Sequence, residues 1–164
     1  MRISLITVCY NAASTLEDAV KSVCGQSIPE GAPFELEYIV VDGGSTDHTM
    51  DVLAPYRKDV TTLISEPDKG LYDAMNKGLA AATGDVVGIL NADDFYADAD
   101  VLADVAQAFL NPEVDAVYGD LHYVDAHDPQ KVVRRWKAGK YNPGAFRRGW
   151  MAPPPAPVIR RGGF

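Results

Sequence analysis

The sequence predicts an α/β protein with a doubly wound, mostly parallel sheet. Two observations predict it: short apolar runs of strand length alternate with amphipathic helical segments, and the runs are continuously apolar. Strands buried on both faces have this pattern, so helices are expected on both sides of the sheet. At 164 residues the chain makes about one domain, which buries roughly 70% of its unfolded surface.

The strands and helices are expected in strict alternation. Strands are predicted at 3–8, 37–41, 60–64, 85–90 and near 114–118, and helices after Ser14 and at 46–56, 70–83 and 98–110. The pattern then changes to a hairpin at 120–136, turning at Asp128-Pro129, and a tail 141–164 rich in Pro, Gly and Arg, with low complexity at 153–157. We therefore divide the chain into an α/β domain, 1–125, and a basic hairpin and tail, 126–164.

Two helix boundaries carry local signals. Ser14 and Glu17 have the spacing of a capping box at the start of the first helix. In the helix at 70–83, Leu71, Met75, Leu79 and Ala82 are expected on the core face, with Gly84 as the C-terminal stop.

Charge is distributed unevenly along the chain. Residues 1–130 contain 23 acidic and six basic residues, a net charge of −17, whereas 131–164 contain nine basic residues and no acid. This distribution predicts that the acidic and the basic parts of the chain meet different partners, and no nucleic acid is expected among those partners. Cys9 and Cys24 form no disulfide framework, which suits a reducing compartment. No apolar run reaches the roughly 20 residues of a membrane span. A cytoplasmic protein is therefore expected.

Polar segments follow four of the predicted strands. They are Thr7-Val-Cys-Tyr-Asn11, Asp42-Gly-Gly-Ser-Thr-Asp47, Glu66-Pro-Asp-Lys-Gly70 and Asn91-Ala-Asp-Asp94. Open parallel sheets bind ligands beyond the carboxyl ends of their strands, so these segments predict one site.

Asp93 and Asp94 are the sharpest feature of that site. Adjacent carboxylates after a buried strand repel each other unless a cation or strong donors lie nearby. Mg²⁺ takes oxygen ligands, commonly one or two carboxylates together with substrate phosphates. The alternative is a solvated turn with Asp94 near a helix start.

The other segments have weaker signals. Asp42 could accept from a uracil-type imide or a ribose hydroxyl while Gly43 lets backbone approach the ligand, or it could simply cap a turn. The first segment lacks the glycines of a dinucleotide-binding loop, which counts against an NAD-dependent enzyme, and Asn11 could be a turn residue. In Gly70–Gly78, Asp73, Asn76 and Lys77 share a helix side, and for Lys77 simple solvation is favoured.

Together these segments resemble family-2 glycosyltransferases of the GT-A fold, over about residues 1–125. The block 66–78 especially resembles enzymes of bacterial surface polysaccharide synthesis, including colanic-acid-type transferases. The resemblance implies a Rossmann-like fold, a UDP- or GDP-linked sugar donor, Mg²⁺ or Mn²⁺, and transfer with inversion to a glycan or lipid-linked acceptor. It implies Asp94 and Asp93 as metal residues. It implies donor-binding roles for Thr7, Tyr10, Asn11, Asp42, Gly43, Ser45, Asp68, Lys69, Gly70, Asp73, Asn76, Asn91 and Asp93.

An inverting transfer needs a general base, which in the family is a carboxylate well downstream of the Asp93-Asp94 loop. Residues 129–164 contain no carboxylate, and Asp120 is favoured over Asp125 and Asp128 because it follows the fifth strand. Alternatively, Asp120 binds the sugar or the acceptor. Two other functions stay open: a nucleotide-sugar-binding fragment without turnover, and a nucleotidyltransferase.

The basic segment from Arg134 to Arg148 has two interpretations. Its cations could contact a lipid-diphosphate acceptor or the anionic inner face of the membrane, or they could pair with the acidic body or with a missing C-terminal segment. We favour the second interpretation, pairing with the acidic body or with such a segment.

Overall fold

The computed structural model describes residues 1–142, 144, 146–152 and 157–162, and so the proline-rich positions 153–156 lie outside it. Four parallel strands form its centre, in the order β3-β2-β1-β4. Cys9 at the end of β1 pairs with Asp42, and the preceding Val8 pairs with Asn91. The parallel sheet is therefore as predicted, with the strands β1 (Arg2–Cys9), β2 (Glu35–Asp42), β3 (Thr62–Ser65) and β4 (Val86–Asn91).

Two further strands complete the sheet and differ from the prediction. β5 (Ala116–Val117) is only two residues long, and β8 (Val158–Arg160) lies between it and β4, antiparallel to both. Val158 is buried, and the Arg160 guanidinium donates to the carbonyls of Val114 and Phe109 at 3.1 and 3.3 Å. Residues near the C-terminus thus join the sheet, although their sequence predicts only a tail.

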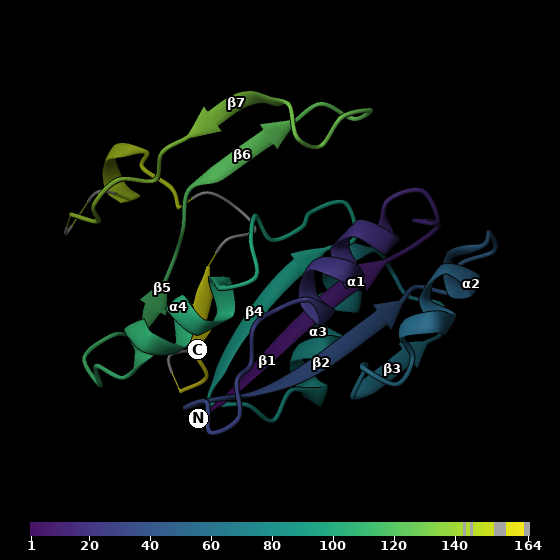
Figure 1. Ribbon diagram of the computed structural model, residues 1–164, viewed down its shortest axis with the longest axis horizontal. Coiled ribbons are helices and arrows are strands. Elements are labelled where there is room, and N and C mark those ends of the chain that lie inside the picture. The colour runs from purple at the N-terminus through teal and green to yellow at the C-terminus, as the bar shows by residue number, and fades with distance from the viewer. Residues whose placement is uncertain (143, 145, 153–156, 163–164) are drawn as a thin grey trace.

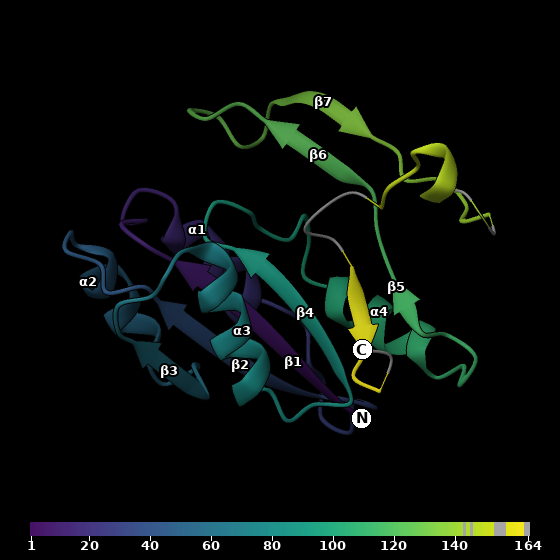
Figure 2. The ribbon, with the colours of Figure 1, turned by 180° about the vertical axis from the view of Figure 1, so that it is seen from behind.

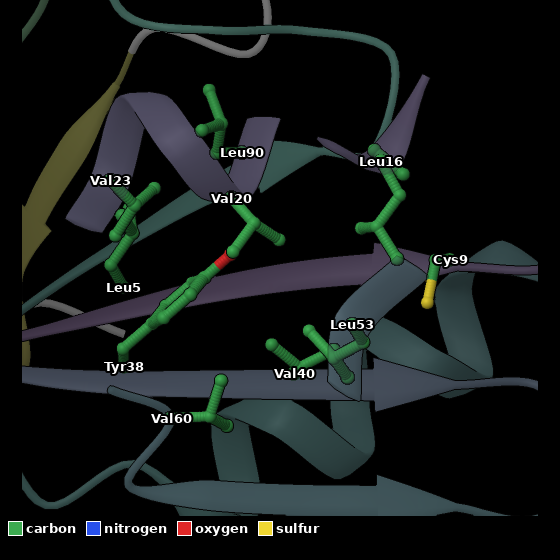
Figure 3. Close-up of a cluster of buried hydrophobic side chains, with 11 residues drawn as sticks. Leu5, Cys9, Leu16, Val20, Val23, Tyr38, Val40, Leu53, Val60 and Leu90 are labelled. Atoms are coloured by element: carbon green, nitrogen blue, oxygen red, sulfur yellow. The ribbon is translucent and has the colours of Figure 1, made fainter. Parts of the chain in front are cut away.

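Helices cover both faces of the sheet, as a doubly wound fold requires (Figures 1 and 2). Side chains of α1, α2 and α4 pack on the face that Leu5 and Ile3 contribute to, and α3 packs on the opposite face against Ile6 and Val8. Figure 3 shows the first cluster, in which Val20 of α1 lies over Tyr38 of β2. The helices are α1 (Leu16–Cys24), α2 (Thr49–Leu53), continued by the 3₁₀ turn η1 (Ala54–Tyr56), α3 (Leu71–Ala81) and α4 (Val101–Phe109).

The predicted capping box is wrong. α1 begins after Thr15, and no side chain caps its first turn. Ser14 is exposed, and the Glu17 carboxylate pairs with Lys21 at 2.9 Å instead of reaching back. A turn in which Leu16 N–H donates to the Ala12 carbonyl at 2.9 Å starts the helix instead.

The predicted core face of α3 is partly wrong. Leu71 is 53% exposed, and the fully buried positions of the helix are Ala74 and Gly78. A β-carbon on Gly78 would lie 2.5 Å from Ile6 Cγ2, so glycine allows α3 to approach β1 closely. Gly84 does not end the helix in a left-handed turn; it lies against the β1 backbone, where a β-carbon would meet Arg2 O at 2.8 Å.

A buried acid, Glu37, joins β2 to the segment before β4. Its carboxylate accepts from the Ser4 hydroxyl and from Thr83 N–H and Oγ1 at 2.8 and 2.7 Å. Burial opposes ionisation, but these hydrogen bonds and the charge of Arg2 outweigh it, so the pKa of Glu37 is lowered. The sequence gives no signal for this network, because Glu37 looks like the polar start of a strand.

The predicted hairpin is confirmed. β6 (Leu121–Val124) pairs antiparallel with β7 (Val132–Trp136) as a separate two-stranded sheet. It lies apart from the main sheet, beyond the end of β4, and the short 3₁₀ turn η2 (Phe146–Arg148) follows it (Figures 1 and 2). No helix within the described ranges is long and apolar enough to cross a bilayer.

Candidate functional site at the carboxyl ends of the strands

The register of the sheet brings the predicted segments to one edge. Asp42 and Asn91 end the strands on either side of β1, and Ser65 at the end of β3 pairs with Asp42. Neighbouring strands lie about 4.8 Å apart, so Asp42 and Asn91 are separated by about 10 Å of sheet. Loops following all four parallel strands therefore border the same surface.

Asp42 is buried below these loops and connects them through hydrogen bonds to its carboxylate. It is only 1% exposed, and its carboxylate accepts from the backbone N–H of Ser45 at 3.1 Å, from the Ser45 hydroxyl and from the Ser65 hydroxyl at 2.7 Å. Burial and then the charge of Asp42 raise the pKa of the neighbouring Cys9 thiol to about 12, so this thiol stays neutral. Because its oxygens are engaged within the chain, Asp42 holds the loops together and does not present an open acceptor to a nucleobase.

Asn11 ties the loop after β1 to the loop after β2. It has a left-handed backbone, with φ of 48°, and its side-chain oxygen accepts from Thr46 N–H at 2.9 Å. Its own N–H donates to the Ser45 hydroxyl at 2.8 Å. Tyr10 is 62% exposed beside it, whereas Thr7 is fully buried, its hydroxyl accepting from Tyr38. Thr7 therefore lies outside the candidate surface, contrary to the role that the resemblance implies.

Asp47 belongs to the same framework, although the sequence did not single it out. Its carboxylate accepts from Thr49 N–H at 3.0 Å, from the Thr49 hydroxyl and from Ala13 N–H at 3.2 Å. The hydrogen bond from the Thr49 side chain is the main reason that the pKa of Asp47 is lowered. The signal that could have revealed it is the Asp-x-Thr spacing just before α2.

Gly43 and Asp68 join the loops after β2 and β3. A β-carbon on Gly43 would lie 2.4 Å from Asp68 Oδ2, so the Asp68 carboxylate fills the space of the missing side chain. Gly44, at φ of 81°, lies against the backbone of Pro67. The other Asp68 oxygen accepts from Gly70 N–H at 2.7 Å, and this bond leads the chain into α3. Asp68 therefore borders the surface next to Asp42.

Ion pairs and hydrogen bonds connect the first turns of α3 to the segment that precedes them, beside this contact. Lys77 Nζ lies 2.9 Å from the Glu66 carboxylate and 3.0 Å from the Pro67 carbonyl, and the Asp73 carboxylate accepts from Lys69 N–H at 3.1 Å. The Lys77 side chain is only 23% exposed, and the hydrogen bond with Glu66 is the main reason that its pKa is raised. The expectation of a merely solvated Lys77 is therefore wrong, whereas the predicted Asn76 is exposed.

The turn after β4 contains the two predicted metal residues. Asp93 is exposed and Asp94 is half-buried, accepting from the Asn91 side-chain amide at 3.2 Å. Burial and then the charge of Asp93 raise the pKa of Asp94. Among the described residues, Asn91 Oδ1 is a buried side-chain oxygen that lacks any hydrogen-bond partner. The turn thus collects oxygen acceptors, and among the described residues no cationic side chain pairs with Asp93 or Asp94.

These acceptors do not by themselves complete a metal centre. No group of three or more His, Cys, Asp and Glu side chains within the described part of the chain is arranged to hold a metal ion. The oxygen set is nevertheless the kind that Mg²⁺ or Mn²⁺ accepts, since such ions commonly keep waters and substrate phosphates as ligands. A cation here would relieve the repulsion that raises the pKa of Asp94.

Asp120 lies in the link between β5 and β6, away from these loops in sequence. It is exposed, and one of its oxygens accepts from Ala138 N–H at 2.9 Å. The adjacent Tyr118 donates to the Gly139 carbonyl at 3.1 Å and packs edge-on against Trp150. The alternatives Asp125 and Asp128 accept backbone N–H groups in the hairpin turn. Of the three carboxylates, Asp120 is the one that follows β5 most closely in the sequence.

Comparisons with known proteins identify the family and the fold. The sequence model of glycosyl transferase family 2 matches residues 4–160. A PGL/p-HBAD biosynthesis glycosyltransferase of Mycobacterium bovis is 40% identical over 123 residues, covering 72% of this chain and 46% of that protein. An uncharacterized glycosyltransferase of Nostoc is 34% identical over 131 residues, covering 78% of this chain and 39% of its own length.

Solved structures show the same fold. The S. aureus protein TarS (residues 1–349), in complex with UDP-GlcNAc, superimposes with a TM-score of 0.74 at 21% identity, covering 99% of this chain and 46% of TarS. The mannosyltransferase PcManGT of Pyrobaculum calidifontis, in complex with GDP-Man and Mn²⁺, gives a TM-score of 0.62 at 29% identity, covering 78% and 37%. The present chain spans less than half the length of each of these four proteins.

Proposed function

Since this chain belongs to glycosyltransferase family 2, we propose that it binds a nucleoside-diphosphate sugar for transfer to an acceptor hydroxyl. The observation that carries the proposal is the turn after β4, where Asp94 has a raised pKa beside Asp93, and where the buried Asn91 Oδ1 finds no hydrogen-bond partner among the residues that the structure describes. Uncompensated oxygens at the carboxyl edge of a parallel sheet are suited to a cation-bridged diphosphate.

In this proposal Asp94 and Asp93 hold Mg²⁺ or Mn²⁺, with Asn91 orienting Asp94 through its amide. When bound, such an ion acts as a Lewis acid that offsets the charge growing on the departing diphosphate. Mn²⁺ in the complex of PcManGT supports this choice of metal. The negative charge of these carboxylates repels a diphosphate that has no bound cation, so the donor and the metal ion bind together.

The donor lies across the loops after β1, β2 and β3. Tyr10 and Asn11 border it on one side and Lys69, Gly70, Asp73 and Asn76 on the other, while the half-buried Asp68 supplies an acceptor next to Gly43. Asp42 and Ser45 position these loops from below. UDP-GlcNAc in TarS and GDP-Man in PcManGT support a UDP- or GDP-linked sugar.

Asp120 is proposed to act as general base. Its free oxygen takes the proton of the acceptor hydroxyl as that oxygen attacks the anomeric carbon, and the nucleoside diphosphate leaves from the opposite face with inversion. The hydrogen bond from Ala138 N–H fixes the orientation of the carboxylate. The acceptor is a glycan or lipid-linked hydroxyl in surface polysaccharide synthesis, reached in the cytoplasm with peripheral contact at the membrane's inner face.

A second candidate is donor binding without turnover. One observation favours it: the proposed base already accepts a backbone hydrogen bond, and no second carboxylate contacts it within the described residues 118–141. Product formation separates the candidates: Asp120→Asn should abolish sugar transfer without weakening donor binding.

Calorimetric titration tests the proposal. UDP and GDP, each alone and with Mn²⁺, are titrated into the protein, into Asp94→Ala and into the matched control Asp59→Ala, which removes an exposed carboxylate from the segment between η1 and β3. We expect metal-dependent binding in the wild type and in the control, with a loss of at least about tenfold, or about 1.4 kcal/mol, in Asp94→Ala. Equal affinities of all three proteins would refute the assignment.

A further inference from the structure

We infer that strand β7, with its outer edge, is the part of the β6–β7 hairpin that docks on an anionic lipid bilayer. The hairpin patch consists of apolar and cationic residues interleaved along β7, whose successive side chains point to opposite faces of the hairpin, and of one aromatic residue of β6 that lies opposite Arg134. Its members are Tyr123, Val132, Val133, Arg134, Arg135 and Lys137. The inference deepens the membrane part of the proposed function by naming the element and the chemistry of its partner.

The cations of the patch form no ion pair with a carboxylate in the described part of the chain, although the Arg134 guanidinium lies over the Tyr123 ring. Among the described residues, Arg134, Arg135 and Lys137 make none of the ion pairs of the structure, whereas Lys131 at the hairpin turn pairs with Asp125 at 3.3 Å. The expectation that the basic segment pairs with the acidic body is therefore wrong for these residues. Their charge is available to an external anionic partner.

Apolar side chains accompany these charges. Val133 is 58% exposed, Tyr123 is 41% exposed and Val132 is 36% exposed. Tyr123 lies opposite Arg134 in the register, with the guanidinium 5.3 Å from the ring centroid. A two-stranded hairpin is at best marginally stable in water unless something packs on it, so exposed valines on its outer strand indicate a covering partner.

A bilayer fits this combination better than a second copy of the chain. Tyrosine and arginine side chains suit the interface between headgroups and acyl chains, where an apolar body and a polar tip are both satisfied. Docking the hairpin onto the acidic body of another copy would be a head-to-tail contact, which propagates into rings or filaments. The acidic residues of the hairpin itself, Asp125 and Asp128, are held at its turn by Lys131 and by backbone N–H groups.

The charge distribution also orients the molecule. Residues 1–130 have a net charge of −17 and are repelled by an anionic surface, while 131–164 have nine basic residues and no acid. The hairpin stands apart from the six-stranded sheet beyond the end of β4, so it can touch a surface while the acidic body stays away (Figures 1 and 2). In that orientation the loop of Asp93 and Asp94 lies on the membrane side of the sheet.

Vesicle co-sedimentation tests the inference. The protein is mixed with vesicles of phosphatidylcholine alone, or of equal parts phosphatidylcholine and phosphatidylglycerol, at low and high salt. Each Lys or Arg near an anionic surface is worth about fivefold in partitioning, so Arg134→Ala/Arg135→Ala should bind anionic vesicles about 25-fold more weakly. Arg134→Lys/Arg135→Lys should bind nearly as well as the wild type, as should Lys21→Ala/Lys58→Ala, which removes the same charge from the body.

Several results would overturn the inference. They are equal binding to both vesicle types, insensitivity to salt, or unchanged binding of Arg134→Ala/Arg135→Ala. Self-association without vesicles in sedimentation equilibrium, lost in the same variant, would assign the patch to a second copy instead. Titration of UDP with Mn²⁺ separates this inference from the proposed function, because the hairpin variant should bind nucleotide as the wild type does.

Discussion

Replacing Gly43 with alanine places a methyl group where the Asp68 carboxylate now lies. The new β-carbon would be 2.4 Å from Asp68 Oδ2 and 3.0 Å from its Cγ. The backbone of Gly43 is not left-handed, so alanine brings no dihedral strain. Asp68 is half-buried at the end of a flexible side chain, and it should therefore rotate away rather than force the loops apart.

The magnitude follows from two opposing terms. Rotation of Asp68 breaks its 2.7 Å hydrogen bond with Gly70 N–H, which costs about 0.5–1.5 kcal/mol. The alanine recovers about 0.4–1 kcal/mol by restricting the unfolded chain. The net effect of Gly43→Ala should therefore lie between about 0.5 kcal/mol stabilising and about 1 kcal/mol destabilising. In an Asp68→Ala background, where nothing occupies the space, the same substitution should stabilise the protein by about 0.4–1 kcal/mol.

Urea unfolding of the wild type, both single variants and the double variant measures this coupling. Gly119→Ala is the matched control, because its β-carbon meets no atom within 4 Å and its φ is not left-handed, so it should stabilise the protein on its own. We expect a coupling free energy of about 0.5–1.5 kcal/mol between positions 43 and 68. Additive effects would refute the contact between the two loops, and UDP binding should weaken in Gly43→Ala if Asp68 contacts the donor.

Three further predictions concern the core and the acids. Gly78→Ala should lower Tm by about 2–8 °C in thermal unfolding, because its β-carbon would lie 2.5 Å from fully buried Ile6; an unchanged Tm would contradict the packing of α3 on β1. Asp94→Asn should raise the free energy of unfolding by about 0.5–2 kcal/mol at neutral pH without metal. The raised pKa of Asp94 means that folding disfavours its ionised form, so the wild-type protein loses stability as pH rises through that pKa and the variant does not. The pKa of Glu37 is lowered, so its effect has the opposite sign. The stability that Glu37 contributes is present above its ordinary pKa of 4.5 and is lost as pH falls through the lower pKa of the folded protein, so Glu37→Gln should flatten the acid limb of a pH–stability curve.

The central sheet was predictable because its strands are buried on both faces. A continuous apolar run such as 3–8 has few alternatives, and the observed β1 extends it by one residue at each end. β8 was not predictable, since Val158–Arg160 is too short for a periodic pattern and pairs with residues about 70 positions earlier. The cap at Ser14 failed because a backbone turn from Ala12 starts α1 before the side chain is needed.

The candidate site was predictable to the level of its loops but not of its atoms. Parallel topology alone brings the segments after β1, β2, β3 and β4 together. The engagement of Asp42 depends on Ser65, a residue of β3 whose position is known only once the register is known. The fit of Asp68 at Gly43 and the ion pair of Lys77 with Glu66 likewise arise from contacts between loops, which no local pattern encodes.

Electron paramagnetic resonance of Mn²⁺ tests the central claim most directly. Free Mn²⁺ has a sharp signal that is lost on binding, so the bound fraction can be measured with and without UDP or GDP. We predict that nucleotide and Mn²⁺ strengthen each other's binding in the wild type and in Asp59→Ala, and that this coupling disappears in Asp94→Ala. Mn²⁺ binding with the same affinity with and without nucleotide, and in the wild type and Asp94→Ala, would contradict the proposed site.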